Sequence, residues 1–341
     1  MPYKVAVIGC GGRGRAHAQG YAQCYDTQLV ACADPFPEAR QAFAEKFFIP
    51  NSYADYHEML EKEKPDIVSI CTWTGMHKEM TLAAVAAGVK AIHSEKPMAP
   101  NFGDAKAIIA ACNHAGVVIT YCHQRRFGGR FVTARNLLRK GAIGEITRIE
   151  GYCHDLIDWG THWFDMLNFY NNETPAEWVM GQIDAAEERS VFGLKLETRG
   201  LSHIKYRNGV HGLVVTGDGS EHGGRCDNRI IGSEGMLEVS SRGKPVRLLN
   251  GNGWSEPALD NVLHPDDTTC TIVDLVESLK TGREPELSGR KALAATELIF
   301  ATYESARRRA RVELPLTSED SAFLSLLETG EIGPAQAQRS A

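Results

Sequence analysis

Residues 5–14 read Val5-Ala6-Val7-Ile8-Gly9-Cys10-Gly11-Gly12-Arg13-Gly14, an apolar run followed by a G-x-G-x-x-G pattern. The run predicts a buried strand, and the alanine-rich residues after it predict a helix. In such a turn, the first glycine allows a tight reversal, the second lets the backbone approach a pyrophosphate, and the third lets the helix pack against the strand. The amide groups that begin the helix would face the phosphates. The stretch predicts a dinucleotide site at Gly9, Gly11, Gly12, Arg13 and Gly14.

A second apolar run, Leu29 to Ala33, ends in Asp34, twenty positions after Gly14. A carboxylate at this position accepts hydrogen bonds from the ribose hydroxyls of a bound dinucleotide and repels a 2′-phosphate. We therefore expect NAD as the cofactor, with NADP less favoured. The alternative is a doubly wound domain that has the same tight turn and binds no nucleotide.

Composition narrows the class of protein. The chain has 341 residues, which suggests two domains, and 43% of them are hydrophobic. Its net charge of −6 argues against a nucleic-acid surface. We find no apolar run near the ~20 residues that span a bilayer, so no membrane partner is expected. The nine cysteines contain no C-x-x-C pair and several lie in apolar runs, which predicts buried, reduced thiols in a cytoplasmic protein without a metal centre or disulfide.

Strand and helix patterns alternate over the first 122 residues and then change. Before residue 122, short strands and helices alternate as in an α/β domain with a parallel sheet covered on both faces. After it, a helix, a strand and a second helix precede several β-like runs, and two helical patterns follow. We predict a Rossmann domain over 1–122, an α+β domain with a mostly antiparallel sheet over 123–316, and a C-terminal tail over 317–341. Strands are expected at 3–8, 28–33, 67–71, 89–93, 117–122, 145–153, 177–183, 200–206, 210–216, 228–232 and 236–240, and helices at 14–24, 37–47, 55–63, 76–87, 102–115, 129–140, 159–170, 266–280 and 290–309.

Two constellations could carry chemistry. The strand at 89–93 leads into Glu95-Lys96-Pro97, which places Lys96 at the carboxyl edge of the parallel sheet, where ligands bind in open α/β folds. Its ammonium can polarise a substrate oxygen, although a solvated surface lysine is an equal alternative. Asp158 and His162 lie four residues apart and would share a helix face, so the histidine could take a hydroxyl proton while the carboxylate orients it.

The segment around His162 has other interpretations. Asp158 could be a helix N-cap and His162 a core histidine between Trp159 and Trp163. The cluster of His154, Asp155, Asp158 and His162 suggests metal ligands, but it lacks a recognised ligand spacing, so we expect no metal.

Together these features resemble the Gfo/Idh/MocA oxidoreductases over residues 3–316. The features that match are the glycine pattern, Asp34, Thr72-Trp73-Thr74-Gly75-Met76-His77, Glu95-Lys96-Pro97, Gln124-Arg125-Arg126-Phe127 and Asp158-x-x-x-His162. The resemblance implies a Rossmann domain followed by an open-faced, mostly antiparallel sheet. It implies a nicotinamide cofactor, a sugar or polyol substrate oxidised or reduced at a secondary alcohol, and a homodimer or homotetramer formed through the open sheet face.

The resemblance also implies site residues. Lys96, Asp158 and His162 would form the catalytic set. Besides the glycine turn and Asp34, the cofactor side would include Thr72, His77, Glu95, Lys96 and Arg126. We also expect Trp73 there, because an aromatic side chain at this position can contact the cofactor. The substrate side would include Lys96, His123, Trp159, His162 and Trp163.

Two departures concern the substrate pocket. Trp73 stands where the family usually has proline, and residues 154–157 replace a common glycine run. We expect a dehydrogenase for a sugar, cyclitol or sugar derivative. The alternatives are a glycoside-cleaving enzyme that keeps NAD bound and oxidises the sugar transiently at C3, and a non-catalytic NAD-dependent regulator.

Overall fold

The computed structural model describes residues 1–217, 227–241, 243–260 and 266–334. The chain forms two compact units. Unit 1 comprises residues 1–100, 104–124 and 263–293, and unit 2 comprises residues 101–103, 125–262 and 294–341. The sequence boundary at 122 lies near that at 124, but unit 1 also takes residues 263–293, which the sequence pattern assigned to the second domain.

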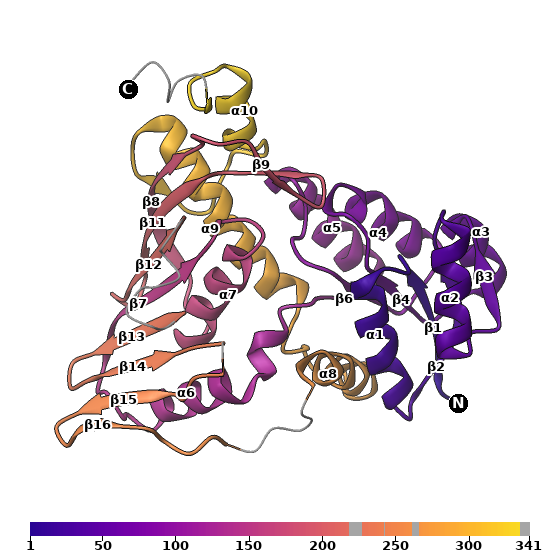
Figure 1. Cartoon of the computed structure of the whole chain (residues 1–341), viewed down its shortest axis with the longest axis horizontal. Helices are drawn as coiled ribbons and strands as arrows, with labels where there is room; N and C mark the ends of the chain where they lie inside the picture. The colour runs from indigo at the N-terminus through magenta and orange to yellow at the C-terminus, as the bar shows by residue number, and fades with distance from the viewer. Residues whose placement is uncertain (218–226, 242, 261–265, 335–341) are drawn as a thin grey trace. The chain divides into compact units, whose positions relative to one another are not determined.

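Unit 1 is built on a six-stranded parallel sheet in the order β3-β2-β1-β4-β5-β6, the arrangement of a dinucleotide-binding domain (Figure 1). The strand order reverses between β1 and β4, and ligands of open α/β sheets bind outside the carboxyl ends of the strands at such a point. Its strands and helices are β1 (Tyr3–Ile8), α1 (Gly12–Gln23), β2 (Thr27–Ala33), α2 (Pro37–Phe47), β3 (Asn51–Tyr53), α3 (Tyr56–Glu63), β4 (Ile67–Ile70), α4 (His77–Ala86), β5 (Ala91–Ser94), β6 (Val118–Tyr121), α8 (Asp267–Thr281) and most of α5 (Phe102–Ala115).

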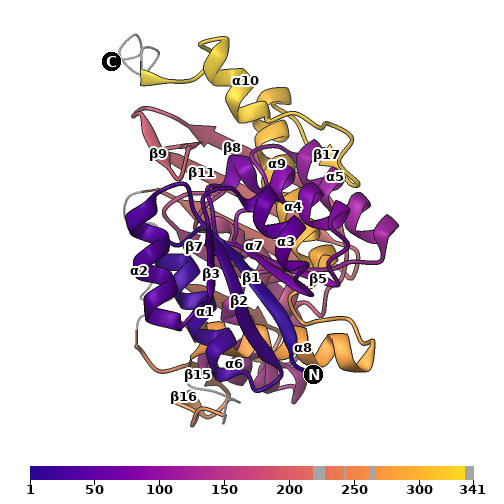
Figure 2. The ribbon, with the colours of Figure 1, turned by 90° about the vertical axis from the view of Figure 1, so that its right-hand side faces the viewer.

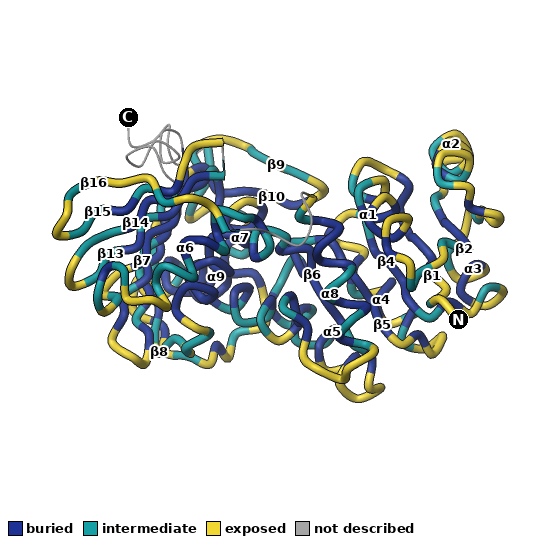
Figure 3. Tube along the Cα trace, turned by 90° about the horizontal axis from the view of Figure 1, so that it is seen from below, coloured by how far each residue is buried: buried dark blue, intermediate teal, exposed yellow. Residues whose placement is uncertain are grey.

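The core of unit 1 explains why α8 belongs to it. Ile272, Leu275 and Val276 of α8 pack with Val5 of β1 and Tyr21 of α1 in one buried cluster. Helix α8 carries an apolar stripe at helical spacing, which needs a partner surface, and the sheet beside α1 supplies it. Figure 2 shows β1 and β2 side by side, and Figure 3 shows β1 and β4 buried while much of α2 is exposed.

Unit 2 contains a nine-stranded sheet in the order β16-β15-β14-β13-β7-β12-β11-β8-β17 (Figure 1). All neighbouring strands are antiparallel except the pair β12–β7, which confirms the predicted mostly antiparallel sheet. Its elements are α6 (Gly129–Arg139), β7 (Ile146–Cys153), α7 (Gly160–Tyr170), β8 (Ala176–Asp184), β9 (Arg189–Val191), β10 (Leu194–Leu196), β11 (Arg199–Tyr206), β12 (His211–Thr216), β13 (Asn228–Gly232), β14 (Met236–Val239), β15 (Arg247–Asn250), β16 (Gly253–Ser255), β17 (Val312–Glu313), α10 (Ala322–Glu328) and most of α9 (Gly289–Arg308).

Side chains alternate across this sheet. Along β11, Ser202, Ile204 and Tyr206 are buried, whereas Leu201 is exposed and His203 is half-buried. The buried face packs against helices of the same unit, as in the hydrogen bond between Ser202 on β11 and Thr302 on α9 (2.8 Å). The opposite face therefore carries the exposed residues of each strand.

The end of the described chain differs from the prediction. The predicted tail contains helix α10, whose Ala322, Phe323 and Leu326 are buried. Residues 335–341, and Cys226 among the cysteines, lie outside the described residues. In the ranges that the structure describes, no helix has the length and apolar character needed to cross a membrane.

Candidate active site

The glycine turn has the geometry that its sequence predicts. Gly9 has a φ of +95°, and a Cβ there would lie 2.6 Å from the Cys71 carbonyl oxygen. A Cβ on Gly14 would lie 2.0 Å from the Gly9 carbonyl oxygen, so neither position admits a side chain. By contrast, no atom lies within 4 Å of the Cβ position of Gly11 or Gly12. This open side of the turn, beside the first amides of α1, fits a pyrophosphate.

Asp34 lies beside this turn because β2 ends there. Its Oδ2 accepts a hydrogen bond from the Cys10 backbone N–H and its Oδ1 accepts one from Phe36 N–H, both at 2.9 Å. A carboxylate has about four acceptor sites, so these two bonds leave capacity for hydroxyl donors. The sequence placed Asp34 near the glycines from spacing alone, and the structure joins them by a hydrogen bond.

The segment after β4 supplies one buried and one exposed predicted residue. The His77 ring is fully buried, with Nδ1 3.0 Å from the Pro97 carbonyl oxygen and Nε2 3.2 Å from that of Thr72. Burial lowers the pKa of His77. It thus links the ends of β4 and β5. Trp73 is 61% exposed, so its ring is available to a ligand.

Glu95, directly after β5, is held from inside unit 1. Its Oε1 accepts hydrogen bonds from Arg13 Nε (2.6 Å) and lies 2.8 Å from His17 Nε2, and its Oε2 lies 3.3 Å from the Lys96 backbone nitrogen. Burial alone would raise the pKa of Glu95, but His17 and Arg13 outweigh it and hold the pKa well below its usual range. Glu95 was predicted on the cofactor side, whereas these contacts make it a link between α1 and the lysine that follows it.

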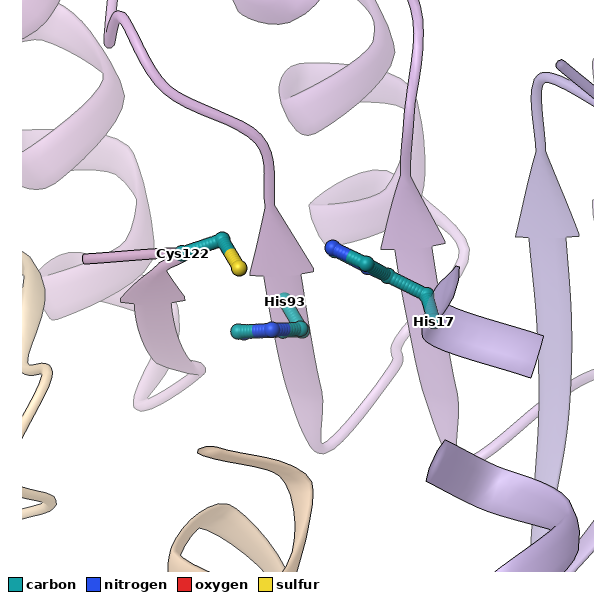
Figure 4. A group of neighbouring side chains, drawn as sticks. All are labelled: His17, His93 and Cys122. Atoms are coloured by element: carbon teal, nitrogen blue, oxygen red, sulfur yellow. The ribbon is translucent and has the colours of Figure 1, made fainter. Parts of the chain in front are cut away.

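Three buried side chains, those of His17, His93 and Cys122, lie together beside the Glu95 contacts (Figure 4). His17 of α1, His93 of β5 and Cys122 offer donor atoms within 4.8 Å of one another, and the two imidazole rings stack at 4.6 Å. Their ring nitrogens already have polar neighbours: His17 Nδ1 lies 2.7 Å from Ser69 Oγ, and His93 lies 2.8 Å from Thr120 Oγ1 and 3.1 Å from Thr271 Oγ1. We interpret the group as a buried hydrogen-bond network.

The pKa values of the two histidines are shifted in opposite directions. Burial lowers the pKa of both rings, but Cys71, Cys122 and Glu95 raise that of His17 well above its usual value. The pKa of His93 stays well below the usual value because burial and the neighbouring His17 both lower it. His17 is therefore the charged partner of Glu95. Sequence reasoning missed both histidines, and the only signal was their position on apolar faces of α1 and β5.

In unit 2, the predicted pair lies at the start of α7. The helix begins at Gly160 and every residue in it is buried, so Asp158 lies in the turn before the helix rather than within it. The prediction that Asp158 and His162 share one helix is therefore wrong, because the turn is organised by Asp155. Asp155 Oδ1 accepts hydrogen bonds from Asp158 N–H (2.6 Å) and Trp159 N–H (3.1 Å). Asp158 and His162 are 6% and 5% exposed.

Of the predicted substrate-side residues, Trp159 is the accessible aromatic. Its ring is 41% exposed and meets His154 edge to face at 5.7 Å. Trp163 is buried and packs beside Phe131, with Arg125 Cζ 4.5 Å from its ring centroid, which is a core environment. His123, in unit 1, is 2% exposed.

Arg126, predicted on the cofactor side, has internal partners. Its Nε and Nη2 form a two-pronged contact with Asp165 at 2.7 and 2.8 Å, and Nη1 contacts Glu173 at 2.5 Å. The guanidinium is almost fully buried, so burial favours its neutral form, but both carboxylates raise its pKa. These contacts give Arg126 a structural role in unit 2.

No metal set forms at the start of α7 among the residues that the structure describes. Within them, donor atoms of at least three potential ligands converge only in the His17 group. The alternative of His154, Asp155, Asp158 and His162 as ligands therefore has no geometric support.

Comparison with known proteins identifies the class. A family profile described as an oxidoreductase family with an NAD-binding Rossmann fold matches residues 3–123. The chain is 27% identical to D-apiose dehydrogenase of Paraburkholderia graminis, over 97% of this chain and 94% of that protein. It is 24% identical to myo-inositol 2-dehydrogenase of Thermotoga maritima, over 91% of this chain and 98% of that protein.

A comparison with solved structures finds the same fold over most of the chain. A structure of levoglucosan dehydrogenase in complex with NADH and levoglucosan matches with a TM-score of 0.81 at 20% identity, covering 93% of this chain and 100% of that one. The glycine turn, the parallel sheet and these matches define an oxidoreductase with an NAD-binding Rossmann domain. The match to the family model covers residues 3–123, and it agrees with the resemblance to the Gfo/Idh/MocA oxidoreductases that the sequence motifs carry.

Proposed function

We propose that the chain is an NAD-dependent dehydrogenase that acts on a secondary alcohol of a sugar, a cyclitol or a sugar derivative. The observation that carries the proposal is the turn at Gly9–Gly14, whose open side adjoins the first amides of α1 and whose Cys10 N–H binds Asp34. This arrangement fits the pyrophosphate and the adenosine ribose of one dinucleotide.

The cofactor preference rests on Asp34. Its carboxylate accepts hydrogen bonds from the backbone N–H groups of Cys10 and Phe36, which fix it beside the turn. A ribose with two hydroxyls can donate to it, whereas a 2′-phosphate would bring like charge into contact. We therefore propose NAD rather than NADP.

The proposed chemistry uses Lys96, Asp158 and His162. NAD, when bound, supplies the acceptor for the hydride that leaves the alcohol carbon. The Lys96 ammonium polarises the alcohol oxygen, and His162 takes its proton, so the alcohol loses one hydride and one proton and becomes a ketone. Asp158 stabilises the charged form of the imidazole. The reverse sequence reduces the ketone.

The substrate class is supported by the relatives and by one side chain. The two curated relatives are named for a pentose sugar and a cyclitol, and the matched structure holds levoglucosan. The exposed Trp159, next to Asp158, offers an aromatic face of the kind that packs on sugar C–H groups.

Two further properties belong to the proposal. We propose a homodimer or homotetramer formed through the exposed face of the nine-stranded sheet. We also propose a cytoplasmic location, which suits Cys10, Cys24, Cys32, Cys71, Cys112 and Cys122, all free thiols in the structure.

The test is turnover by the wild type and by two variants. NADH formation would be followed with NAD and a panel of D-apiose, myo-inositol, levoglucosan and an aryl glucoside. Lys96→Ala and His162→Ala should each lower kcat by about 10²–10⁴-fold. Lys62→Ala and His57→Ala, at exposed positions of helix α3, are the matched controls and should keep full activity.

Three outcomes would contradict the proposal. Full activity in Lys96→Ala and His162→Ala would remove the mechanism. Release of the aglycone with no lasting NADH would indicate the glycoside-cleaving enzyme instead. Tight NAD binding without turnover of any substrate in the panel would favour the regulator.

A further inference from the structure

Two buried carboxylates flank the turn that precedes α7. Asp155 is 2% exposed and Glu197 is fully buried, and both belong to unit 2. Asp155 binds the N–H groups of Asp158 and Trp159, as described above. The Glu197 carboxylate accepts a hydrogen bond from the N–H of Leu156, the residue directly after Asp155. The two acids thus hold successive parts of one turn.

Glu197 connects this turn to the rest of unit 2. It follows β10, and its second oxygen accepts a hydrogen bond from the Tyr303 hydroxyl of α9 at 2.9 Å. The chain makes room for the contact at Gly200, where a Cβ would lie 2.7 Å from Leu156 Cδ1. At the other end of the turn, a Cβ on Gly160 would lie 2.7 Å from the Asp155 carbonyl oxygen. The backbone of the turn is therefore fitted closely on both sides.

Hydrophobic folding alone does not account for an acid at position 197. Burial and, after it, the nearby Asp155 raise the pKa of Glu197 to about 7, although the Leu156 N–H and the Tyr303 hydroxyl act to lower it. The titratable groups around the pair also include Cys153, whose thiol contacts the Asp155 carbonyl oxygen at 3.3 Å. A buried carboxyl in this setting costs stability, and an apolar side chain would avoid that cost.

We propose that Glu197 is a positioning residue, which fixes the 155–160 turn through Leu156 and thereby sets the placement of Asp158 and His162. The inference rests on the proposed function for the roles of those two side chains. The essential property of Glu197 is reach: its side chain must be long enough to bring an oxygen to the Leu156 N–H. A shift of about 1 Å in a catalytic group can lower the rate 100-fold, so a small movement of this turn is sufficient.

Two variants separate the length of the Glu197 side chain from the acidity of its end group. Glu197→Gln keeps the length and an acceptor oxygen for Leu156, and its amide can donate to the Tyr303 hydroxyl. Glu197→Asp keeps the carboxyl group but withdraws it from the Leu156 N–H. We expect Glu197→Gln to stay within about 3-fold of wild-type kcat and Glu197→Asp to lose about 10- to 100-fold, with KM for NAD unchanged in both.

Ser202→Ala is the matched control. It removes a buried hydrogen bond between β11 and α9 but touches no residue of the turn. It should lower the melting temperature and leave kcat within about 3-fold of wild type. If Glu197→Asp lost no more activity than Ser202→Ala, or if Glu197→Gln were the more impaired of the two Glu197 variants, the positioning role would be wrong.

A second measurement does not depend on turnover. Hydrogen–deuterium exchange of the peptide spanning residues 154–164 reports directly on the amides of the turn. Exchange there should be faster in Glu197→Asp than in wild type and unchanged in Glu197→Gln and Ser202→Ala. Equal exchange in Glu197→Asp and wild type would overturn the inference. This result is obtained even if the wild type oxidises none of the substrates, so failure of the proposed function is recognised separately.

Discussion

At the scale of single residues, Asp34 decides between two cofactors that differ by one phosphate. Replacing its carboxylate with a hydroxyl removes the repulsion of a 2′-phosphate and one acceptor for the ribose. We expect Asp34→Ser to narrow the preference for NAD over NADP by about 10-fold or more, measured as the ratio of dissociation constants by fluorescence titration. Asp55→Ser, an acid on the exposed N-cap of α3, should leave the ratio unchanged. Tighter binding of NADP than NAD by the wild type would contradict the assignment of Asp34.

Glu197 predicts a pH dependence of stability whose sign is defined. Its pKa rises from about 4.5 in the unfolded chain to about 7 in the folded one, mainly through burial. Above pH 4.5 the unfolded chain releases this proton while the folded chain keeps it. Stability from this group is therefore lost as pH rises from about 4.5 to about 7, and the loss amounts to about 3 kcal/mol.

Glu197→Gln removes that titration. Relative to wild type, it should gain stability as pH rises through this interval and show a constant difference above about pH 7. Urea denaturation at a series of pH values measures the free energy of unfolding directly. Ser202→Ala should shift the wild-type curve without changing its slope. Parallel curves for wild type and Glu197→Gln would show that the acid does not titrate as its burial requires.

At the scale of elements, the sequence predicted the helices and strands whose bounds depend on local residue patterns. The helix at Pro37–Phe47 and the strands at Tyr3–Ile8 and Asn228–Gly232 have their predicted bounds, because periodicity and turn residues define them. Short strands such as Asn51–Tyr53 and Val312–Glu313 were missed. Their two or three residues carry no alternation of their own, and partners far along the chain determine the pairing.

The candidate site also contains local features, which the sequence predicted, and contacts between distant residues, which it did not. The glycine turn and Asp34 were predictable because strand, turn and helix follow one another within about thirty residues of sequence. The contact of His17 with Glu95 joins residues 78 positions apart, and that of Glu197 with Leu156 joins residues 41 apart. Nothing in a single sequence pairs such residues, because the sheet order and the hairpin β9–β10 bring them together. The alternative of Asp158 as the cap of α7 concerns a local contact instead: Asp155 binds the N–H groups of Asp158 and Trp159, three and four residues further on.

At the scale of the whole molecule, the exposed face of the nine-stranded sheet predicts self-association. Met180 on β8 and Leu201 on β11 are 50% and 44% exposed, and Leu213 and Val215 on β12 continue the same face. The strand registers place these side chains next to one another: Leu201 pairs with Val215, and His203, between Met180 and Leu213, pairs with both. An apolar stripe across three strands is typical of a surface that another subunit covers.

Leu201→Asp tests this surface. In a two-fold interface each substitution acts twice, so a buried aspartate on both copies should dissociate the assembly. We expect the mass measured by light scattering to fall from a multiple of 37.4 kDa to 37.4 kDa. Leu82→Asp, at a similarly exposed leucine on α4, should keep the wild-type mass. A monomeric wild type, or a Leu201→Asp variant that stays assembled, would exclude this face as the interface. An aspartate buried there without a partner would destabilise the assembly by more than the contact of one leucine stabilises it.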